Sequence, residues 1–251
     1  MINEWNGFRA EQFMFEEHLA TVVFPEEGTK CGGLALKTEY QHHFPEAAEI
    51  PLLQLGYHVC FIENDNRFGR EPDLDRKARF VRYLQEKYGL RKKCVPVGFS
   101  CGGMIGLYFA ERYPELVSCL YIDAPVVNFM SWPCHFGQEN LKPGLDEILP
   151  ALGLKNLAEL MAYRKMPLDK IPSLIEKKIP LVMVSGDSDT TVPYDENGLF
   201  VERAYKEAGL PIEVYIKPGG NHHPHGFPDP KPVIDFILRY DVNSSSQNTE
   251  I

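Results

Sequence analysis

A serine between closely spaced glycines is the first group in this sequence that could do chemistry. Ser100 lies in "GFSCGG", with Gly98 two positions before it and Gly102 two positions after it. The stretch follows an apolar run and opens a helical pattern, the setting in which a sharp strand-to-helix turn exposes a serine as a nucleophile. Glycine is expected at both positions because a Cβ there would clash across the turn. The alternative is a glycine-rich turn in which the serine caps the helix.

A serine hydroxyl needs a base to act as a nucleophile at neutral pH, and the base needs a carboxylate that orients it. Two later apolar runs end in such groups. "PLVMVS" is followed by Asp187 and Asp189, and "IEVYIK" is followed by a loop with His222, His223 and His225. Either aspartate could also cap a turn. These residue types, in this order, predict acyl transfer through a Ser-His-Asp triad.

Three histidines so close together also raise the question of a metal. Pro224 prevents a regular helical spacing between them, and no cluster of carboxylates or cysteines accompanies them. We therefore expect no metal site, and the predicted chemistry needs no organic cofactor. Cys101 is not expected to be the nucleophile, because a side chain directly after such a turn points into the fold.

The elements that must position these residues alternate along the chain. The first two of the expected strands are only two residues apart, which predicts an antiparallel hairpin. The alternation predicts an α/β fold in a single domain, 1–251, with an eight-stranded, mostly parallel sheet and helices on both faces. Asp73 is the expected N-cap of the first helix and Gly89 its C-terminal stop. Pro96 lies inside a strand, where it indicates a bulge. The expected strands are 12–16, 19–24, 33–38, 58–62, 94–99, 117–122, 180–185 and 212–217, and the expected helices 73–89, 102–114, 196–209 and 229–240.

Residues 126–178 interrupt this alternation and are long enough to form a small cap or lid. Their "FMSWPCHF" stretch offers Trp132 and His135 as pocket residues, although its aromatic side chains could equally anchor the cap. The polar C-terminal residues 243–251 are expected to be disordered.

Composition limits the partners and the compartment. The 251 residues carry a net charge of -9, which argues against binding to nucleic acid or to an anionic membrane. The sequence does not open with a basic stretch followed by an apolar one, so no signal peptide is expected. No apolar run is long enough to span a membrane. The six cysteines are scattered without CxxC spacing, which favours reduced thiols and a cytoplasmic location. A homo-oligomer is compatible with this composition.

The sequence resembles the α/β-hydrolases in "GFSCGG", "SGDSDTTVPYDENG" and "KPGGNHHPHGFPDPKPVIDFI", and in the order of its elements from residue 12 to 240. The resemblance implies the α/β-hydrolase fold. In that family the acid usually lies three residues after the glycine that ends the seventh strand, which here is Asp189. The histidine usually closes a short glycine-containing loop after the eighth strand, which points to His222. Asn221 stands where a glycine is common, so His223 and His225 remain alternatives.

The resemblance also implies an oxyanion site made of backbone amides. One amide is that of Cys101, and the other comes from the loop after the third strand, where Tyr40 is the candidate. Glu39 and His223 join the expected pocket. A subgroup of esterase-like proteins with similar "LKTEY…FP" and "HHPH" stretches is associated with carbohydrate breakdown. We expect a serine esterase that acts on a small-molecule, acetyl-like ester of an alcohol or carbohydrate. A serine peptidase of the same fold and a non-catalytic ligand-binding protein are the alternatives.

Overall fold

The computed structural model describes residues 2–137 and 141–243. Among these residues a nine-stranded sheet has the order β1-β2-β3-β5-β4-β6-β7-β8-β9. The pairs β1–β2, β2–β3 and β3–β5 are antiparallel, and all later pairs are parallel. The strands are β1 Glu4–Trp5, β2 Phe8–Phe15, β3 His18–Val23, β4 Leu34–Lys37, β5 His58–Ile62, β6 Val95–Phe99, β7 Leu120–Asp123, β8 Leu181–Gly186 and β9 Ile212–Lys217.

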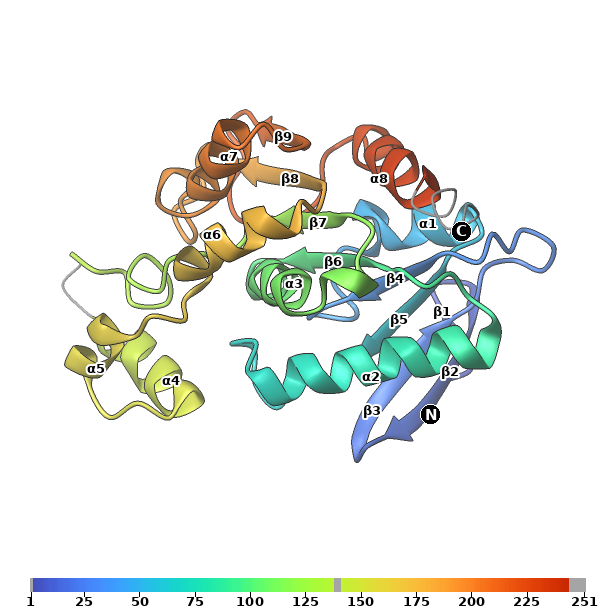
Figure 1. Ribbon diagram of the computed structural model, residues 1–251, viewed down its shortest axis with the longest axis horizontal. Coiled ribbons are helices and arrows are strands. Elements are labelled where there is room, and N and C mark those ends of the chain that lie inside the picture. The colour runs from blue at the N-terminus through green and yellow to red at the C-terminus, as the bar shows by residue number, and fades with distance from the viewer. Residues whose placement is uncertain (1, 138–140, 244–251) are drawn as a thin grey trace.

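Helices cover both faces of this sheet, as Figure 1 shows. The core on one face is formed with α2, α3, α6 and α7, and the core on the other face with α1 and α8. The α/β fold expected from the sequence is therefore confirmed. The helices are α1 Glu49–Gln54, α2 Glu71–Tyr88, α3 Cys101–Arg112, α4 Lys142–Leu152, α5 Leu157–Ala162, α6 Pro167–Lys177, α7 Gly198–Glu207 and α8 Lys231–Asn243, with short 3-10 turns at Pro45–Ala47, Pro114–Leu116 and Tyr194–Glu196.

The sheet has one strand more than the eight expected. The additional strand, β1, is only two residues long and pairs Trp5 with Phe8 across a two-residue turn. Both turn residues, Asn6 and Gly7, have positive φ, at 47° and 82°. An Asn-Gly pair is the sequence mark of such a hairpin turn, so the signal for β1 was present in the sequence. The expected hairpin of β2 and β3 is confirmed, with its turn at Glu16 and Glu17.

Pro96 is the second residue of β6, a strand with a neighbour on each side. Cys94 bridges Val117, an offset of 23 residues, whereas Val97 pairs with Tyr121, an offset of 24. The β7 side therefore carries one extra residue opposite the proline, which is the bulge that the sequence indicated. The bulge accommodates a strand residue that has no N–H to donate.

The start of α2 differs from the expectation. The helix begins at Glu71, and Asp73 is a fully buried residue of its first turn instead of the N-cap. Its carboxylate accepts a hydrogen bond from the Asp65 amide (2.9 Å) and pairs with Arg76. The carboxylate thus accepts a hydrogen bond from a backbone amide of the preceding loop and not from an amide at the start of the helix. Gly89 does end the helix, with a left-handed φ of 64°.

The segment between β7 and β8 contains α4, α5 and α6. In Figure 1, α4 and α5 lie away from the sheet, whereas α6 packs against α3 and α7 on one of its faces. The crossover helix α6 therefore takes up part of the span 126–178 that was expected to be a cap. Of the expected disordered tail 243–251, residues 244–251 lie outside the described residues.

Two further observations bear on the expectations from composition. Within 2–137 and 141–243, no helix combines the length and the apolar character needed to cross a bilayer. All six cysteines are free thiols, of which Cys31 is exposed and the other five are buried.

Candidate active site

Ser100 stands in a strained turn between β6 and α3. Its backbone has φ 53° and ψ −117°, a conformation that costs a non-glycine residue about 1–3 kcal/mol and that persists only where neighbours enforce it. The Ser100 amide donates to the Asp123 carbonyl (2.8 Å), and the Ser100 carbonyl accepts from the Val126 amide (3.2 Å). The backbone of the serine is therefore held on both sides, by the last residue of β7 and by the chain that follows it.

The glycines around the serine differ in how closely they are packed. A Cβ built on Gly98 would lie 2.1 Å from the Gly102 carbonyl oxygen, so no side chain fits there. On Gly102 the nearest atom would be the Thr38 hydroxyl oxygen, at 3.1 Å, and on Gly103 it would be a Pro125 carbon, at 2.8 Å. The turn is thus tightest at Gly98.

The structure brings the serine, a histidine and an aspartate together. Nε2 of His222 lies 3.1 Å from the Ser100 hydroxyl oxygen, and Nδ1 of His222 lies 2.7 Å from Oδ2 of Asp189. The residues are only 7%, 6% and 5% exposed, in the order Ser100, His222, Asp189. Ser100 occupies the N-cap position of α3, but its side chain makes no capping hydrogen bond. The hydroxyl faces the imidazole instead, which does not fit the simple cap considered above.

Asp189 is held as a carboxylate. Its Oδ1 accepts hydrogen bonds from the amides of Thr191 (2.9 Å) and Val192 (2.8 Å). Burial tends to raise the pKa of Asp189, but the hydrogen bonds from His222 and these two amides outweigh it and leave the pKa below its ordinary value. An ionised Asp189 favours the tautomer of His222 that carries its proton on Nδ1, so that Nε2 is free to accept one from the serine.

Asp187 has a different place. Its Oδ1 accepts hydrogen bonds from the Gly219 amide (2.7 Å) and the Ser188 hydroxyl (3.0 Å), and its side chain is exposed. It therefore braces the two loops that carry Asp189 and His222, which corresponds to the turn-capping alternative.

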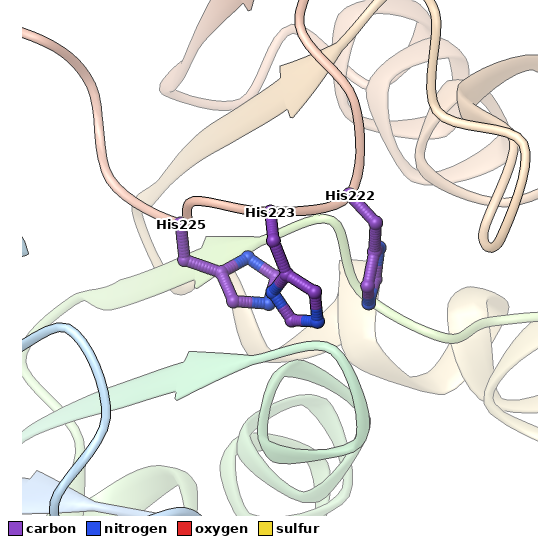
Figure 2. A group of neighbouring side chains, drawn as sticks. All are labelled: His222, His223 and His225. Atoms are coloured by element: carbon purple, nitrogen blue, oxygen red, sulfur yellow. The ribbon is translucent and has the colours of Figure 1, made fainter.

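The three histidines of the loop after β9 lie together on the same side of the chain, as Figure 2 shows. Their ring centroids are 4.8–4.9 Å apart in every pair. His225 is buried, and its Nδ1 lies 2.9 Å from Oδ1 of Asp123 at the end of β7. His223 is exposed and stacks on Phe44. The structure therefore joins His222, and neither of the two alternatives, to Ser100.

The sequence did not indicate the role of Asp123. Besides its contact with His225, its Oδ2 accepts a hydrogen bond from the Gly226 amide (2.6 Å), which ties the histidine loop to β7. Burial lowers the pKa of His225, although the hydrogen bond with Asp123 acts in the opposite direction. The signal was an aspartate at the carboxyl end of a strand next to β6, which is the sheet edge where functional groups gather.

The loop after β4 lies directly against the turn that carries the serine. The Thr38 hydroxyl oxygen lies 2.6 Å from the Gly102 carbonyl oxygen, to which it donates, and 3.2 Å from the Val97 carbonyl oxygen, which fixes this loop to the elbow. Tyr40 follows with a positive φ of 57°. The segments that contain Tyr40 and Cys101 are therefore held together beside Ser100. Cys101 itself is fully buried, and burial raises the pKa of its thiol to about 11, so the thiol stays protonated at neutral pH.

The expected pocket residues lie in different surroundings. Glu39 accepts a hydrogen bond from Asn64. Trp132 stacks on Phe68, with ring centroids 6.1 Å apart, and the Arg67 guanidinium lies 4.9 Å from the centre of its ring. His135 lies in the same turn as Trp132, where its amide donates to the Ser131 carbonyl (2.9 Å), and no hydrogen bond of the described residues joins it to the triad.

Arg67 was not singled out in the sequence. It makes two hydrogen bonds to the carboxylate of Glu147 in α4, at 2.6 and 2.7 Å, and lies 3.4 Å from the Tyr40 hydroxyl. Arg67, Trp132 and Tyr40 therefore connect the segment that follows β7 to the body of the fold. An arginine in an irregular loop has no sequence pattern that would reveal such a contact.

The sequence is similar to those of known α/β-hydrolases. The sequence model of a family described as "alpha/beta hydrolase fold" matches residues 42–146. A thermostable monoacylglycerol lipase of Bacillus sp. (strain H-257) is 27% identical over 55% of this chain and 62% of its own length. A monoacylglycerol lipase of Mycolicibacterium smegmatis is 24% identical over 70% of this chain and 73% of its own length.

Two further proteins with other printed names also match. The acylamino-acid-releasing enzyme of Sus scrofa is 25% identical over 61% of this chain, which spans 21% of that enzyme. The crystal structure of a Bacteroides ovatus protein described as a dipeptidyl aminopeptidase IV superimposes with a TM-score of 0.65 at 15% identity. It covers 94% of this chain, which spans 35% of that protein, and at this identity the likeness concerns the fold alone.

Proposed function

We propose that this chain, which belongs to the α/β-hydrolase superfamily and is similar to its esterases, is a serine hydrolase that cleaves carboxylic esters with a short acyl group. The observation that carries the proposal is the continuous contact from the Ser100 hydroxyl through the His222 imidazole to the Asp189 carboxylate, at 3.1 and 2.7 Å. Each of these residues comes from the carboxyl end of a different strand, β6, β8 or β9, so their meeting reflects the whole sheet.

In the proposed reaction, His222 Nε2 removes the proton from Ser100 while the hydroxyl oxygen attacks the ester carbonyl carbon. The Asp189 carboxylate stabilises the imidazolium that forms. The amides of Cys101 and Tyr40 donate to the oxyanion of the tetrahedral intermediate, and the amide of Cys101 lies at the N-terminus of α3, where negative charge is favoured.

Collapse of this intermediate breaks the bond to the alcohol, which leaves after it receives the proton from His222. The Ser100 acyl ester then reacts with water, which gives its proton to the same imidazole. A second tetrahedral intermediate releases the carboxylic acid and restores the serine hydroxyl. Apart from the ester and water, every group in these steps belongs to the chain.

The packing beside the elbow supports a short acyl group. The Tyr40 side chain contacts the Cys101 thiol, and its hydroxyl lies 3.4 Å from the Arg67 guanidinium. Arg67 in turn lies over the Trp132 ring, which stacks on Phe68. We propose that these large side chains limit the length of the acyl group. Trp132, His135, His223 and Glu39 remain the proposed pocket residues.

The two relatives named monoacylglycerol lipase support an ester as the substrate. The match to the acylamino-acid-releasing enzyme favours a second candidate, a serine peptidase that would use the same triad. The cytoplasmic location expected from the sequence remains part of the proposal and can be checked by cell fractionation.

Hydrolysis of p-nitrophenyl acetate by the wild type and by Ser100→Ala tests the proposal. We expect the variant to lose about 10⁵- to 10⁶-fold in kcat, as removal of a triad nucleophile does elsewhere. Equal rates in the two proteins would reject the serine mechanism. Release of p-nitroaniline from an acylated amino-acid anilide by the wild type, lost in Ser100→Ala, would favour the peptidase.

A further inference from the structure

The histidine loop places three imidazole rings around one point. Nitrogen atoms of His222, His223 and His225, one from each ring, lie within 4.8 Å of one another. Figure 2 shows all three rings on the same side of the loop. The sequence argued against a metal site because Pro224 excludes helical spacing, but the loop brings the rings together without a helix.

Two of these rings are oriented as metal-binding histidines commonly are. Nδ1 of His222 contacts the Asp189 carboxylate (2.7 Å), and Nδ1 of His225 contacts the Asp123 carboxylate (2.9 Å). A carboxylate on one ring nitrogen fixes the tautomer and increases the basicity of the other nitrogen, which is the usual second sphere of a metal site. Both aspartates are buried, so the two Nε2 atoms are held by rigid supports.

The third ring can adjust its position. Zinc–nitrogen bonds of 2.0–2.1 Å in tetrahedral geometry put ligand nitrogens about 3.4 Å apart, so the rings must close by up to about 1.4 Å. His223 is exposed and held by stacking on Phe44, with centroids 5.6 Å apart, and can therefore move. Lys217 is a nearby cation, and its ammonium group already donates a hydrogen bond to the Pro224 carbonyl (2.7 Å).

We propose that His222, His223 and His225 form a binding site for Zn²⁺ and that the bound metal inhibits the hydrolase. A neutral imidazole has one nitrogen lone pair, so Nε2 of His222 can accept the Ser100 proton or bind the metal, but not both. Zinc is the metal expected because imidazole ligands suit it, whereas Mg²⁺ prefers oxygen ligands. The fourth position would be filled by water. The inhibition, unlike the binding itself, rests on the proposed function.

Metal binding is measured first, without reference to activity. Titration of metal-free protein with Zn²⁺ in a calorimeter should give one site per chain, and Co²⁺ should give the visible absorption of a tetrahedral complex. His223→Asn removes an exposed ligand and should weaken Zn²⁺ binding at least tenfold, in line with the 10–100-fold cost of losing even a second-sphere partner. Ser100→Ala removes the competing hydroxyl and should bind Zn²⁺ at least as tightly as the wild type.

His18→Asn is the matched control, because His18 lies on β3, far along the sheet from β9, and bonds Asp65. It should bind Zn²⁺ as the wild type does. Zn²⁺ binding that is unchanged in both His223→Asn and His225→Asn, or that is absent in the wild type, would overturn the proposal.

Inhibition is then measured on p-nitrophenyl acetate, with each protein compared with its own rate in a chelator. Zn²⁺ should inhibit the wild type at the concentrations at which it binds, His223→Asn should require at least tenfold more, and Mg²⁺ should have no effect. Binding with an increased rate would contradict inhibition. If the wild type bound Zn²⁺ through these histidines yet hydrolysed no ester, the metal site would stand and the proposed function would fail.

Discussion

Substituting Gly98 tests whether the geometry of the turn, and not only the presence of the triad, supports catalysis. An alanine Cβ at this position would lie 2.1 Å from the Gly102 carbonyl oxygen and 2.7 Å from the Gly103 nitrogen. Both neighbours are backbone atoms of the first turn of α3, so no side chain can rotate away. The backbone itself must move in Gly98→Ala.

The size of this movement follows from the contact. Real Cβ atoms essentially never approach a non-bonded atom closer than 3.0 Å, so the turn must open by about 0.9 Å. Ser100 lies between the two segments that separate, and its hydroxyl is already 3.1 Å from His222. A misplacement of about 1 Å at a reacting group can reduce the rate about 10²-fold, so we expect at least that loss in kcat/KM.

The assay is p-nitrophenyl acetate hydrolysis together with thermal unfolding, on a graded series of glycine substitutions. Gly89→Ala is the control, because Gly89 also has a positive φ of 64° but a Cβ there would meet nothing within 4 Å. It should lose about 1–2 kcal/mol of stability and keep its activity. Gly102→Ala, whose Cβ would lie 3.1 Å from the Thr38 hydroxyl oxygen, should fall between the two. A folded Gly98→Ala protein with kcat/KM within threefold of the wild type would refute this reasoning.

Three other predictions concern single side chains. Asp189→Asn should lower kcat about 10⁴-fold. The lowered pKa of Asp189 gives stability that is fully present above its ordinary pKa of 3.8 and is lost as the pH falls through the folded value. In urea titrations, the unfolding free energies of wild type and variant should therefore differ at pH 7 and converge as the pH falls below 3.8. Burial, with the charges of Lys30 and Arg9, lowers the pKa of His58 to about 4, so the folded state resists its protonation. The wild type should therefore lose on the order of 3 kcal/mol of stability as pH falls from 6.5 to 4, and His58→Gln should show a flatter profile over that interval; identical profiles would count against it. Trp132→Ala should raise kcat/KM for hexanoate relative to acetate p-nitrophenyl esters about tenfold, and an unchanged ratio would place the acyl pocket elsewhere.

The sequence was most informative where local chemistry and topology coincide. The glycines around Ser100 are required by one turn, and the apolar runs before Asp189 and His222 predict parallel strands whose carboxyl ends meet at one edge. The strand-helix alternation then brings these residues to the same edge of the sheet. The short strand β1 was not predicted, because a strand of two residues is too short to show an alternation of apolar and polar residues. The Asn6-Gly7 pair did indicate its turn.

The remaining features depend on contacts between distant segments. Asp123 and His225 are 102 residues apart, and only the packing of the loop after β9 against β7 makes them partners. Arg67 and Glu147 are 80 residues apart and join a loop to α4. No periodicity or motif reports such pairs. For the base, the resemblance pointed to His222 but left His223 and His225 as alternatives, and of the three rings it is His222 whose Nε2 lies 3.1 Å from the Ser100 hydroxyl oxygen.

The most direct test of the central claim is labelling with a fluorophosphonate probe, which reacts with an activated serine, followed by mass spectrometry. The tryptic peptide 94–112 contains Ser100 as its only serine, so a modified peptide can be assigned without ambiguity among serines. We predict that the wild type is labelled on this residue, that Ser100→Ala is not labelled, and that His222→Ala is labelled far more slowly. Labelling of a different serine, or equal labelling of the wild type and Ser100→Ala, would contradict the account.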